Sequence, residues 1–323
     1  MDMNFTKYAH KVFLLITGLG LAVNGYSQSF LTNGLVAYYP FNRNANDMAG
    51  TNDGVPSGAT LTVDRFGNAN SAYLFNGTNS FIQTVHPMQD MTTATFCIWF
   101  NAETTDATSD NPALLSDSDT AGGNDCIIQL IHQGSTHGIF IAANKNIAWS
   151  NQAVITNGIA NFTQSITNNW LHFVWVMTPT EQTVYVNGTE VAALSISGND
   201  VGYHSAGLVM GAADLWTPWR GFYSGKIDDV RIYNRALSGN EVQQLYAFES
   251  LPIIALAAST NTVTPSFSNL YLRTNYQLQV SSDLNTWTNQ GSPFTPTNTV
   301  MAYPQYFDVL NWNRLFFRLQ LSP

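Results

Sequence analysis

Short apolar segments separated by turn residues fill most of this chain, and this rhythm restricts the folds open to it. Five of these segments are the clearest, at 35–41, 72–75, 81–85, 93–100 and 170–177. Between them lie stretches rich in Gly, Asn, Asp and Pro. Many short strands with frequent turn signals are typical of β-sandwiches and barrels. The chain is 45% hydrophobic and 13% aromatic, enough to bury a sizeable core. We therefore predict an all-β fold, an antiparallel two-sheet jelly-roll sandwich.

Two local patterns sharpen this prediction near the end of the sandwich. Asn187-Gly188 separates two β-prone triplets, and Asn-Gly favours the tight turn of a β-hairpin. The segment 226–233 alternates with period two, which places Asp228 on the face of Val230 and Ile232.

A short helix is predicted directly after that strand. Ser238 and Glu241 are spaced as a capping box, in which each side chain bonds a backbone N–H near the helix start. Val242, Leu245 and Tyr246 then form an apolar stripe. We expect this helix to pack on the sandwich.

Length and a change in composition indicate two domains. The sandwich is predicted over residues 34–250. Residues 253–323 carry few charges and read as a small separate β domain, with strands at 276–280 and 315–319.

The first 27 residues have the features of an export signal. Lys7 and Lys11 precede an apolar run at 12–23, and Gly25 and Ser27 are small residues suited to cleavage before Gln28. A membrane anchor is the alternative, but a run of this length falls short of the roughly 20 residues that span a bilayer. We predict removal of 1–27, no membrane span, and a secreted, extracellular or cell-surface protein.

Charge excludes one class of partner. The chain has 12 basic and 21 acidic residues, a formal net charge of −9. Nucleic-acid binding needs clustered Lys and Arg, so no nucleic-acid partner is expected. The two cysteines, Cys97 and Cys126, could form a disulfide in an oxidising compartment or remain buried thiols, and the sequence leaves both open.

Four separated motifs resemble one known family. They are GLVAYYPFNRNANDMAG, DRFGNANSAYLFNGTNSFI, the run from Trp170 into VYVNGTEV, and GKIDDVRIYNRALSGNEVQQLY. Together they resemble the LamG-like jelly-roll family of the concanavalin A-like lectin/glucanase superfamily. The resemblance implies two stacked antiparallel sheets, one of them concave, binding of carbohydrates or sometimes proteins, and in many members a structural calcium. Residues 276–319 resemble, less specifically, a small C-terminal module of secreted bacterial proteins.

Asp228 is the first candidate for a metal ligand. A carboxylate facing the core is costly unless it is paired or metal-bound, and calcium accepts carboxylate and backbone oxygens. The turn at Asn76-Gly77 could supply carbonyls, and the resemblance implies that related sandwiches use an Asp of this last strand. Asp47 is a weaker companion for which turn stabilisation is the expected role. The alternative for Asp228 is a hydrogen-bond anchor without metal.

Loop aromatic residues are the candidates for ligand binding. Trp216, Trp219 and Arg220 lie in the Pro- and Gly-punctuated segment LWTPWRG, and Trp149 is a third aromatic option. Aromatic rings can stack on sugar faces, while an arginine can bind a hydroxyl or carboxylate. The alternative is a hydrophobic lid over the end of the sandwich.

Catalysis has little support in the sequence. Glycoside hydrolysis usually needs a pair of carboxylates, and laminarinase-type relatives carry Glu-x-Asp-x-x-Glu on one strand. None of the five glutamates fits that spacing: Glu103, Glu181, Glu190, Glu241 and Glu249. We therefore predict a secreted, non-enzymatic module that binds an extracellular glycan. A cell-surface adhesion or structural protein is the alternative, and a glycoside hydrolase is less favoured.

Overall fold

The computed structural model describes residues 28–321 apart from thirteen segments. These are 85–90, 104–110, 118–125, 134–135, 144–151, 157–165, 196–207, 214–219, 251, 260, 271–274, 299 and 309–313. The predicted signal, residues 1–27, lies outside the described residues. No helix in the described part of the chain is long and apolar enough to cross a membrane.

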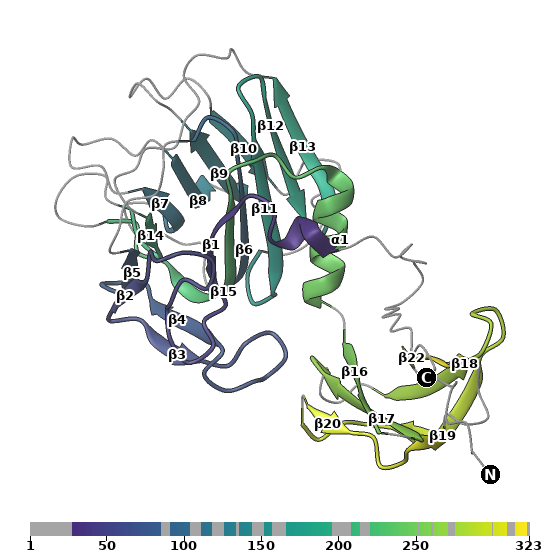
Figure 1. Ribbon diagram of the computed structural model, residues 1–323. Helices are drawn as coiled ribbons and strands as arrows, with labels where there is room; N and C mark the ends of the chain where they lie inside the picture. The colour runs from purple at the N-terminus through teal and green to yellow at the C-terminus, as the bar shows by residue number, and fades with distance from the viewer. Residues whose placement is uncertain are drawn as a thin grey trace, which may run out of the picture. The chain divides into compact units, whose positions relative to one another are not determined.

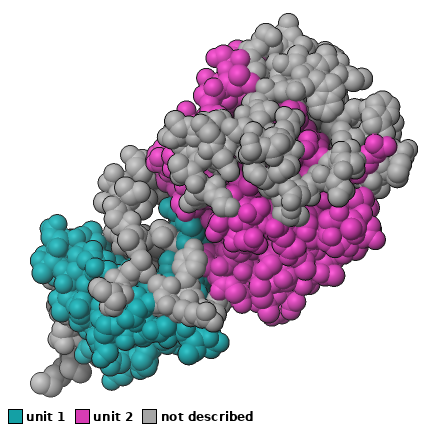
Figure 2. Space-filling model, turned by 180° about the vertical axis from the view of Figure 1, so that it is seen from behind, with its two compact units in different colours: residues 1–27, 247–323 teal, residues 28–246 magenta. Residues whose placement is uncertain are grey.

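The chain forms two compact units (Figure 2). The larger comprises residues 28–246, and the smaller contains the described residues from 247 onward. The boundary falls inside the one α-helix of the described residues, α1 (Gly239–Ser250).

The larger unit consists of two antiparallel sheets (Figure 1). The eight-stranded sheet contains β1 (Leu35–Tyr39), β3 (Thr60–Thr62), β4 (Ala72–Asn76), β6 (Ala94–Ala102), β11 (Leu171–Met177), β12 (Glu181–Val186), β13 (Thr189–Ser195) and β15 (Ser224–Tyr233). Its order is β13-β12-β11-β6-β15-β4-β3, with β1 also paired to β15. Many neighbouring strands in this sheet are not consecutive in the sequence, as in a jelly roll, which is the predicted fold class.

The seven-stranded sheet lies opposite. It contains β2 (Gly54–Ser57), β5 (Phe81–Thr84), β7 (Ala113–Asp117), β8 (Cys126–Gln133), β9 (Thr136–Ala143), β10 (Gln152–Thr156) and β14 (Leu208–Met210). Its order is β10-β9-β8-β7-β14-β5-β2.

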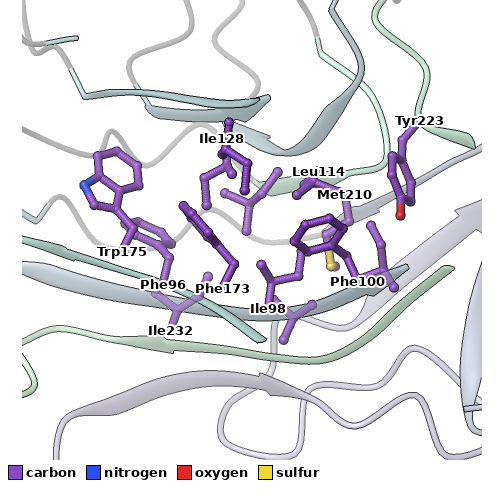
Figure 3. Packing of buried hydrophobic residues seen from close by; sticks show 14 of the residues in the cluster. Phe96, Ile98, Phe100, Leu114, Ile128, Phe173, Trp175, Met210, Tyr223 and Ile232 are labelled. Carbon is purple, nitrogen blue, oxygen red and sulfur yellow. The ribbon is translucent and has the colours of Figure 1, made fainter. Parts of the chain in front are cut away.

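The main core fills the space between the two sheets (Figure 3). Phe96, Phe173 and Trp175 of the eight-stranded sheet point toward Ile128 and Met210 of the other. The rings of Phe96 and Trp175 stack with centroids 5.4 Å apart. Period-two alternation explains this packing, because every second residue of β6 faces the same side.

A second apolar layer covers the outer face of the eight-stranded sheet. A short 3₁₀ turn, η1 (Gln28–Leu31), and α1 pack there. The predicted capping box is present: the backbone N of Ser238 donates to Glu241 Oε2 at 2.8 Å, and the backbone N of Glu241 donates to Ser238 Oγ at 3.3 Å. Val242 and Leu245 are fully buried against the sheet, as their stripe predicted.

The predicted hairpin is also formed. Asn187 and Gly188 connect β12 to β13 with φ of 49° and 74°, the left-handed pair that an Asn-Gly turn adopts at low cost.

The smaller unit contains two short antiparallel sheets around its own core. One comprises β16 (Ile253–Ala258), β17 (Thr262–Ser268), β20 (Met301–Ala302) and β21 (Phe307–Asp308). The other has the order β19-β18-β22, formed by β18 (Tyr276–Ser281), β19 (Thr288–Phe294) and β22 (Phe316–Leu321).

One prediction about β15 is wrong. The alternation expected along this strand is broken between Asp228 and Arg231, where the register against β6 shifts, and Asp229 has a φ of 41°. Two residues, 229 and 230, oppose one residue of β6, which is a β-bulge. Ile227, Val230 and Ile232 therefore share the core face. Asp228 does not share that face; it pairs with Trp99, whose neighbours in β6, Ile98 and Phe100, face the core.

Candidate functional site

The bulge of β15 carries a buried ionic cluster, here called the Arg65 cluster: Tyr38, Arg65, Asp228, Asp229 and Arg231. Arg65 Nη1 lies 2.6 Å from Asp228 Oδ2, and its Nη2 lies 2.8 Å from Asp229 Oδ2. The Tyr38 hydroxyl donates to Asp229 Oδ1 at 2.7 Å. The Arg65 side chain is only 6% exposed. One guanidinium thus bridges two adjacent carboxylates.

Strand pairing explains why an arginine can enter here. The first half of β15, Ser224–Ile227, pairs with β4, and the second half, 230–233, pairs with β1. Asp228 and Asp229 lie where one partner strand ends and the other begins. Arg65, from the loop between β3 and β4, reaches both carboxylates at that point.

Aromatic rings surround the guanidinium. The Cζ of Arg65 lies 4.5 Å from the ring centroid of Trp99 and 4.6 Å from that of Phe66. Trp99 in turn stacks with His172 of β11 and Tyr246 of α1, at 5.0 and 5.8 Å. The Arg65 cluster and these rings therefore connect the sheet, a loop and the helix. Each buried cation–π contact of this kind contributes about 1–2 kcal/mol to the stability of the folded state.

Burial separates the pKa values in this cluster. Burial and the neighbouring charge of Asp229 raise the pKa of Asp228 well above its ordinary value. Burial also acts on Asp229, but Arg65, Arg231 and the Tyr38 hydroxyl outweigh it and lower its pKa. For His172, burial and then Arg65 lower the pKa to about 3, so its imidazole is neutral at physiological pH.

Two adjacent carboxylates with opposite pKa shifts could suggest a hydrolase, but their surroundings do not fit one. Their side chains are 3% and 15% exposed, and both are engaged by Arg65. A sugar could not reach either without displacing that arginine. The cluster is suited to fixing the β15 bulge and the strands beside it.

The residues predicted as calcium ligands do not meet at one point. Asn76 pairs with Ser224, four residues before Asp228, which puts it about 13 Å away along the strand. The Asn76 side chain instead organises its own turn, where Oδ1 accepts the backbone N–H groups of Thr78 and Asn79 at 2.9 and 3.1 Å. Gly77 supplies the positive φ of 73° that this turn requires. Asp228 has an arginine as its partner in place of the turn oxygens.

Asp47 stabilises a turn, which is the role that the sequence favoured for it. Its Oδ1 accepts the backbone N–H groups of Tyr38 and Ala49, each at 2.9 Å, and its Oδ2 accepts that of Asn52 at 3.2 Å. Both carboxylate oxygens are thus engaged by backbone donors. No group of three or more His, Cys, Asp or Glu side chains that could hold a metal ion occurs among the described residues.

Calcium binding stays a prediction with a direct test. A bound ion adds its binding free energy to the native state, so its removal by EDTA should lower the melting temperature. We expect the shift to be reversed by excess calcium and absent when calcium-saturated EDTA is used. Identical melting curves with and without EDTA would contradict the calcium prediction.

Residues 214–219, with Trp216 and Trp219, lie outside the described residues, but the neck that flanks this loop, Ala213 and Arg220, is described. Ala213 and Arg220 form an antiparallel bridge with two backbone hydrogen bonds of 2.9 and 3.0 Å. The next residue, Gly221, accepts the backbone N–H of Ala113 at 2.8 Å, which anchors the neck to the start of β7. The Arg220 side chain is exposed beside it.

Trp216 and Trp219 stay predictions as ligand-binding residues, because only the two flanking residues of their segment, Ala213 and Arg220, are described. Trp149 lies outside the described residues.

Only one of the two cysteines, Cys97, has a described side chain. Cys97 is a buried thiol packed between the eight-stranded sheet and α1. This outer layer and the main core lie on opposite sides of the eight-stranded sheet. Strand β8, which begins at Cys126, contributes to the main core. The side chain of Cys126 itself lies outside the described residues. Of the two alternatives, the disulfide receives no support.

Two central residues of this region were missed by sequence reasoning, Arg65 and His172. Arg65 lies within the motif DRFGNA, and an arginine in a chain with only 12 basic residues could have been matched with Asp228-Asp229. His172 stands in an otherwise apolar strand, LHFVWVM, which itself signals a buried imidazole.

Comparison with known proteins identifies the family. The family model described as "Concanavalin A-like lectin/glucanases superfamily" (Laminin G) matches residues 76–243, more than half of the chain. The chain belongs to this family. No curated protein matches it in sequence.

Several solved structures share the fold. Domain 4 of the extracellular arabinanase AbnA from Geobacillus stearothermophilus, in complex with arabinotriose, is 21% identical, covers 66% of this chain and 98% of its own, and has a TM-score of 0.49. The binding domain of botulinum neurotoxin serotype D is 10% identical over 83% of this chain and 82% of its own, with a TM-score of 0.52. The same toxin's ligand-binding domain with N-acetylneuraminic acid is 12% identical over 81% and 69%, with a TM-score of 0.50. For the two toxin domains the likeness shows the fold alone.

Proposed function

We propose that this protein is a secreted, non-catalytic module whose sandwich binds carbohydrate at the loop between Ala213 and Arg220. The observation that carries the proposal is the neck of that loop. It fixes the two residues that flank the segment 214–219, and one of them, Arg220, is exposed. The sequence adds two tryptophans to this guanidinium, and apolar surface with few polar groups suits a sugar.

The family and the fold support the same proposal. The family description names lectins, and a toxin domain of this fold is described in complex with N-acetylneuraminic acid. The one adjacent carboxylate pair noted above, Asp228 and Asp229, is buried and bound by Arg65. Binding without hydrolysis is therefore the favoured function.

A glycan array with the chain from Gln28 onward tests the proposal. We expect Trp216→Ala and Trp219→Ala each to weaken binding roughly tenfold or more, because buried tryptophans at an interface commonly contribute about 2 kcal/mol. Arg220→Ala should weaken binding less. Tyr306→Ala is the matched control, since this tyrosine is 69% exposed and lies in the other unit.

The array separates the alternatives. Binding that survives both tryptophan variants would move the site elsewhere on the protein. A protein that binds no glycan but self-associates with rising concentration would favour the adhesion function. Release of reducing sugar from a bound polysaccharide would show that the protein is an enzyme.

A further inference from the structure

The smaller unit presents a polar strip across the outer face of its sheet β19-β18-β22. In β18 and β22, Leu278, Val280, Phe317 and Leu319 point into the core of this unit. The residues between them face the opposite side, since side chains alternate along a strand. Gln279 of β18 lies in register with Asn289 of β19 and with Arg318 of β22. The three side chains form a row of about 10 Å across three strands.

Hydrogen bonds fix the direction of this row. Arg318 Nε donates to Gln279 Oε1 at 2.7 Å, and Gln279 Nε2 donates to Asn289 Oδ1 at 2.7 Å. A guanidinium can only donate, so it determines which way the Gln279 amide points, and Gln279 then determines the orientation of Asn289. The groups left at the two ends are N–H donors: the Nη atoms of Arg318 and the Nδ2 of Asn289.

Trp287 holds the guanidinium in place. The Cζ of Arg318 lies 4.2 Å from the centroid of the Trp287 ring. The indole Nε1 donates to the carbonyl of Leu284 at 3.1 Å. The loop before it is tied by Asp283, whose Oδ1 accepts the backbone N–H groups of Asn285 and Thr286, each at 2.8 Å. Indole and guanidinium are both half-buried and oriented before any ligand arrives.

Arg318 has no carboxylate partner among the residues that the structure describes. Within the described part of the chain no carboxylate lies within ion-pair distance of it. Residues 251–323 contain three arginines and two aspartates, whereas the whole chain has a net charge of −9. The smaller unit, which is the less acidic part of the protein, therefore holds the Arg318 guanidinium in a fixed position with its Nη donors available to a ligand.

We propose that the strip of Trp287, Arg318, Gln279 and Asn289 is a second binding site, for a carboxylate-bearing sugar of an acidic polysaccharide. The Nη donors of Arg318 match the two oxygens of a carboxylate, the most favourable partner for a planar guanidinium. The indole offers apolar surface to a sugar ring, and Asn289 Nδ2 offers a donor to a hydroxyl. The strip combines one cation with several neutral amides, which fits one carboxylate among many hydroxyls. An acidic peptide, with a charge on every residue, would call for clustered cations.

Polygalacturonate is the probe, and binding to the chain from Gln28 onward is measured by affinity electrophoresis and calorimetry. Gln279→Glu is the decisive variant, because it keeps the shape of the row and gives Arg318 a carboxylate within the chain. We expect it to weaken binding roughly tenfold or more. Trp287→Ala and Arg318→Gln should do the same. Melting curves of each variant verify that the unit remains folded.

Arg314→Gln is the matched charge control, since this arginine is exposed and lies before β22. It should bind like the unchanged protein. Carboxyl-reduced polygalacturonate and polyglutamate should bind weakly. An equal loss in Arg314→Gln, equal binding of polyglutamate, unchanged binding in Gln279→Glu, or no binding of polygalacturonate at all would each overturn the proposal.

Discussion

Arg65→Ala is expected to lower the free energy of unfolding of the sandwich by about 3–5 kcal/mol, since it leaves buried carboxylates without their cation. Asp228 and Asp229 lose their shared partner, at 2.6 and 2.8 Å. The contacts of the guanidinium with Trp99 and Phe66 disappear as well. The measurement is urea denaturation followed by tryptophan fluorescence. The two compact units require two transitions to be fitted, and only that of the sandwich should move.

Two further variants show whether charge is the cause. Arg220→Ala removes an exposed arginine and should change stability by no more than about 0.5 kcal/mol. The triple variant Arg65→Met, Asp228→Asn, Asp229→Asn removes the cation and both carboxylates together. It should recover part of the loss, because removing a buried cation together with the carboxylates it binds costs less than removing the cation alone, although Arg231 stays charged. A shift below about 1 kcal/mol for Arg65→Ala would contradict the structural role of the cluster.

The sequence predicted the elements of the sandwich well because its signals there are local. The Asn187-Gly188 turn depends on positive φ values at two adjacent residues, and the Ser238–Glu241 box depends on neighbouring hydrogen bonds within one turn. Such signals need no knowledge of the rest of the fold.

The bulge at Asp229 was not predictable from the same rules. Strict alternation along 226–233 puts Asp228 on the core face, whereas one inserted residue reverses the faces on either side of it. The bulge occurs where β15 changes its partner from β4 to β1, and that change is a property of the assembled sheet. The wrong face for Asp228 also hid its contact with Arg65. Arg65 is 163 residues away in sequence, and nothing local connects the two.

Acid should destabilise the sandwich through His172. Its pKa is about 3 in the folded protein, lowered mainly by burial, against 6.5 for an ordinary histidine. Between these values the unfolded chain binds a proton and the folded chain does not. The free energy of unfolding therefore rises with pH across this range, by up to about 1.4 kcal/mol per pH unit. Above pH 6.5 this contribution is complete and constant, and it is lost as the pH falls toward 3.

His172→Phe isolates this contribution from those of the carboxylates. Phenylalanine keeps a ring against both Trp99 and Tyr246, which contact the imidazole at 5.0 and 5.8 Å, and it does not titrate. The measured quantity is the difference in unfolding free energy between variant and unchanged protein, from urea denaturation at a series of pH values. Between pH 7 and pH 4 it should shift in favour of the variant by roughly 3 kcal/mol. Tyr246→Phe, which alters the same stack without changing a group that titrates in this range, should give a difference independent of pH. A constant difference for His172→Phe would mean that the imidazole is protonated in the folded state as readily as in the unfolded chain. In that case Arg65, Arg231 and burial together would not keep it neutral.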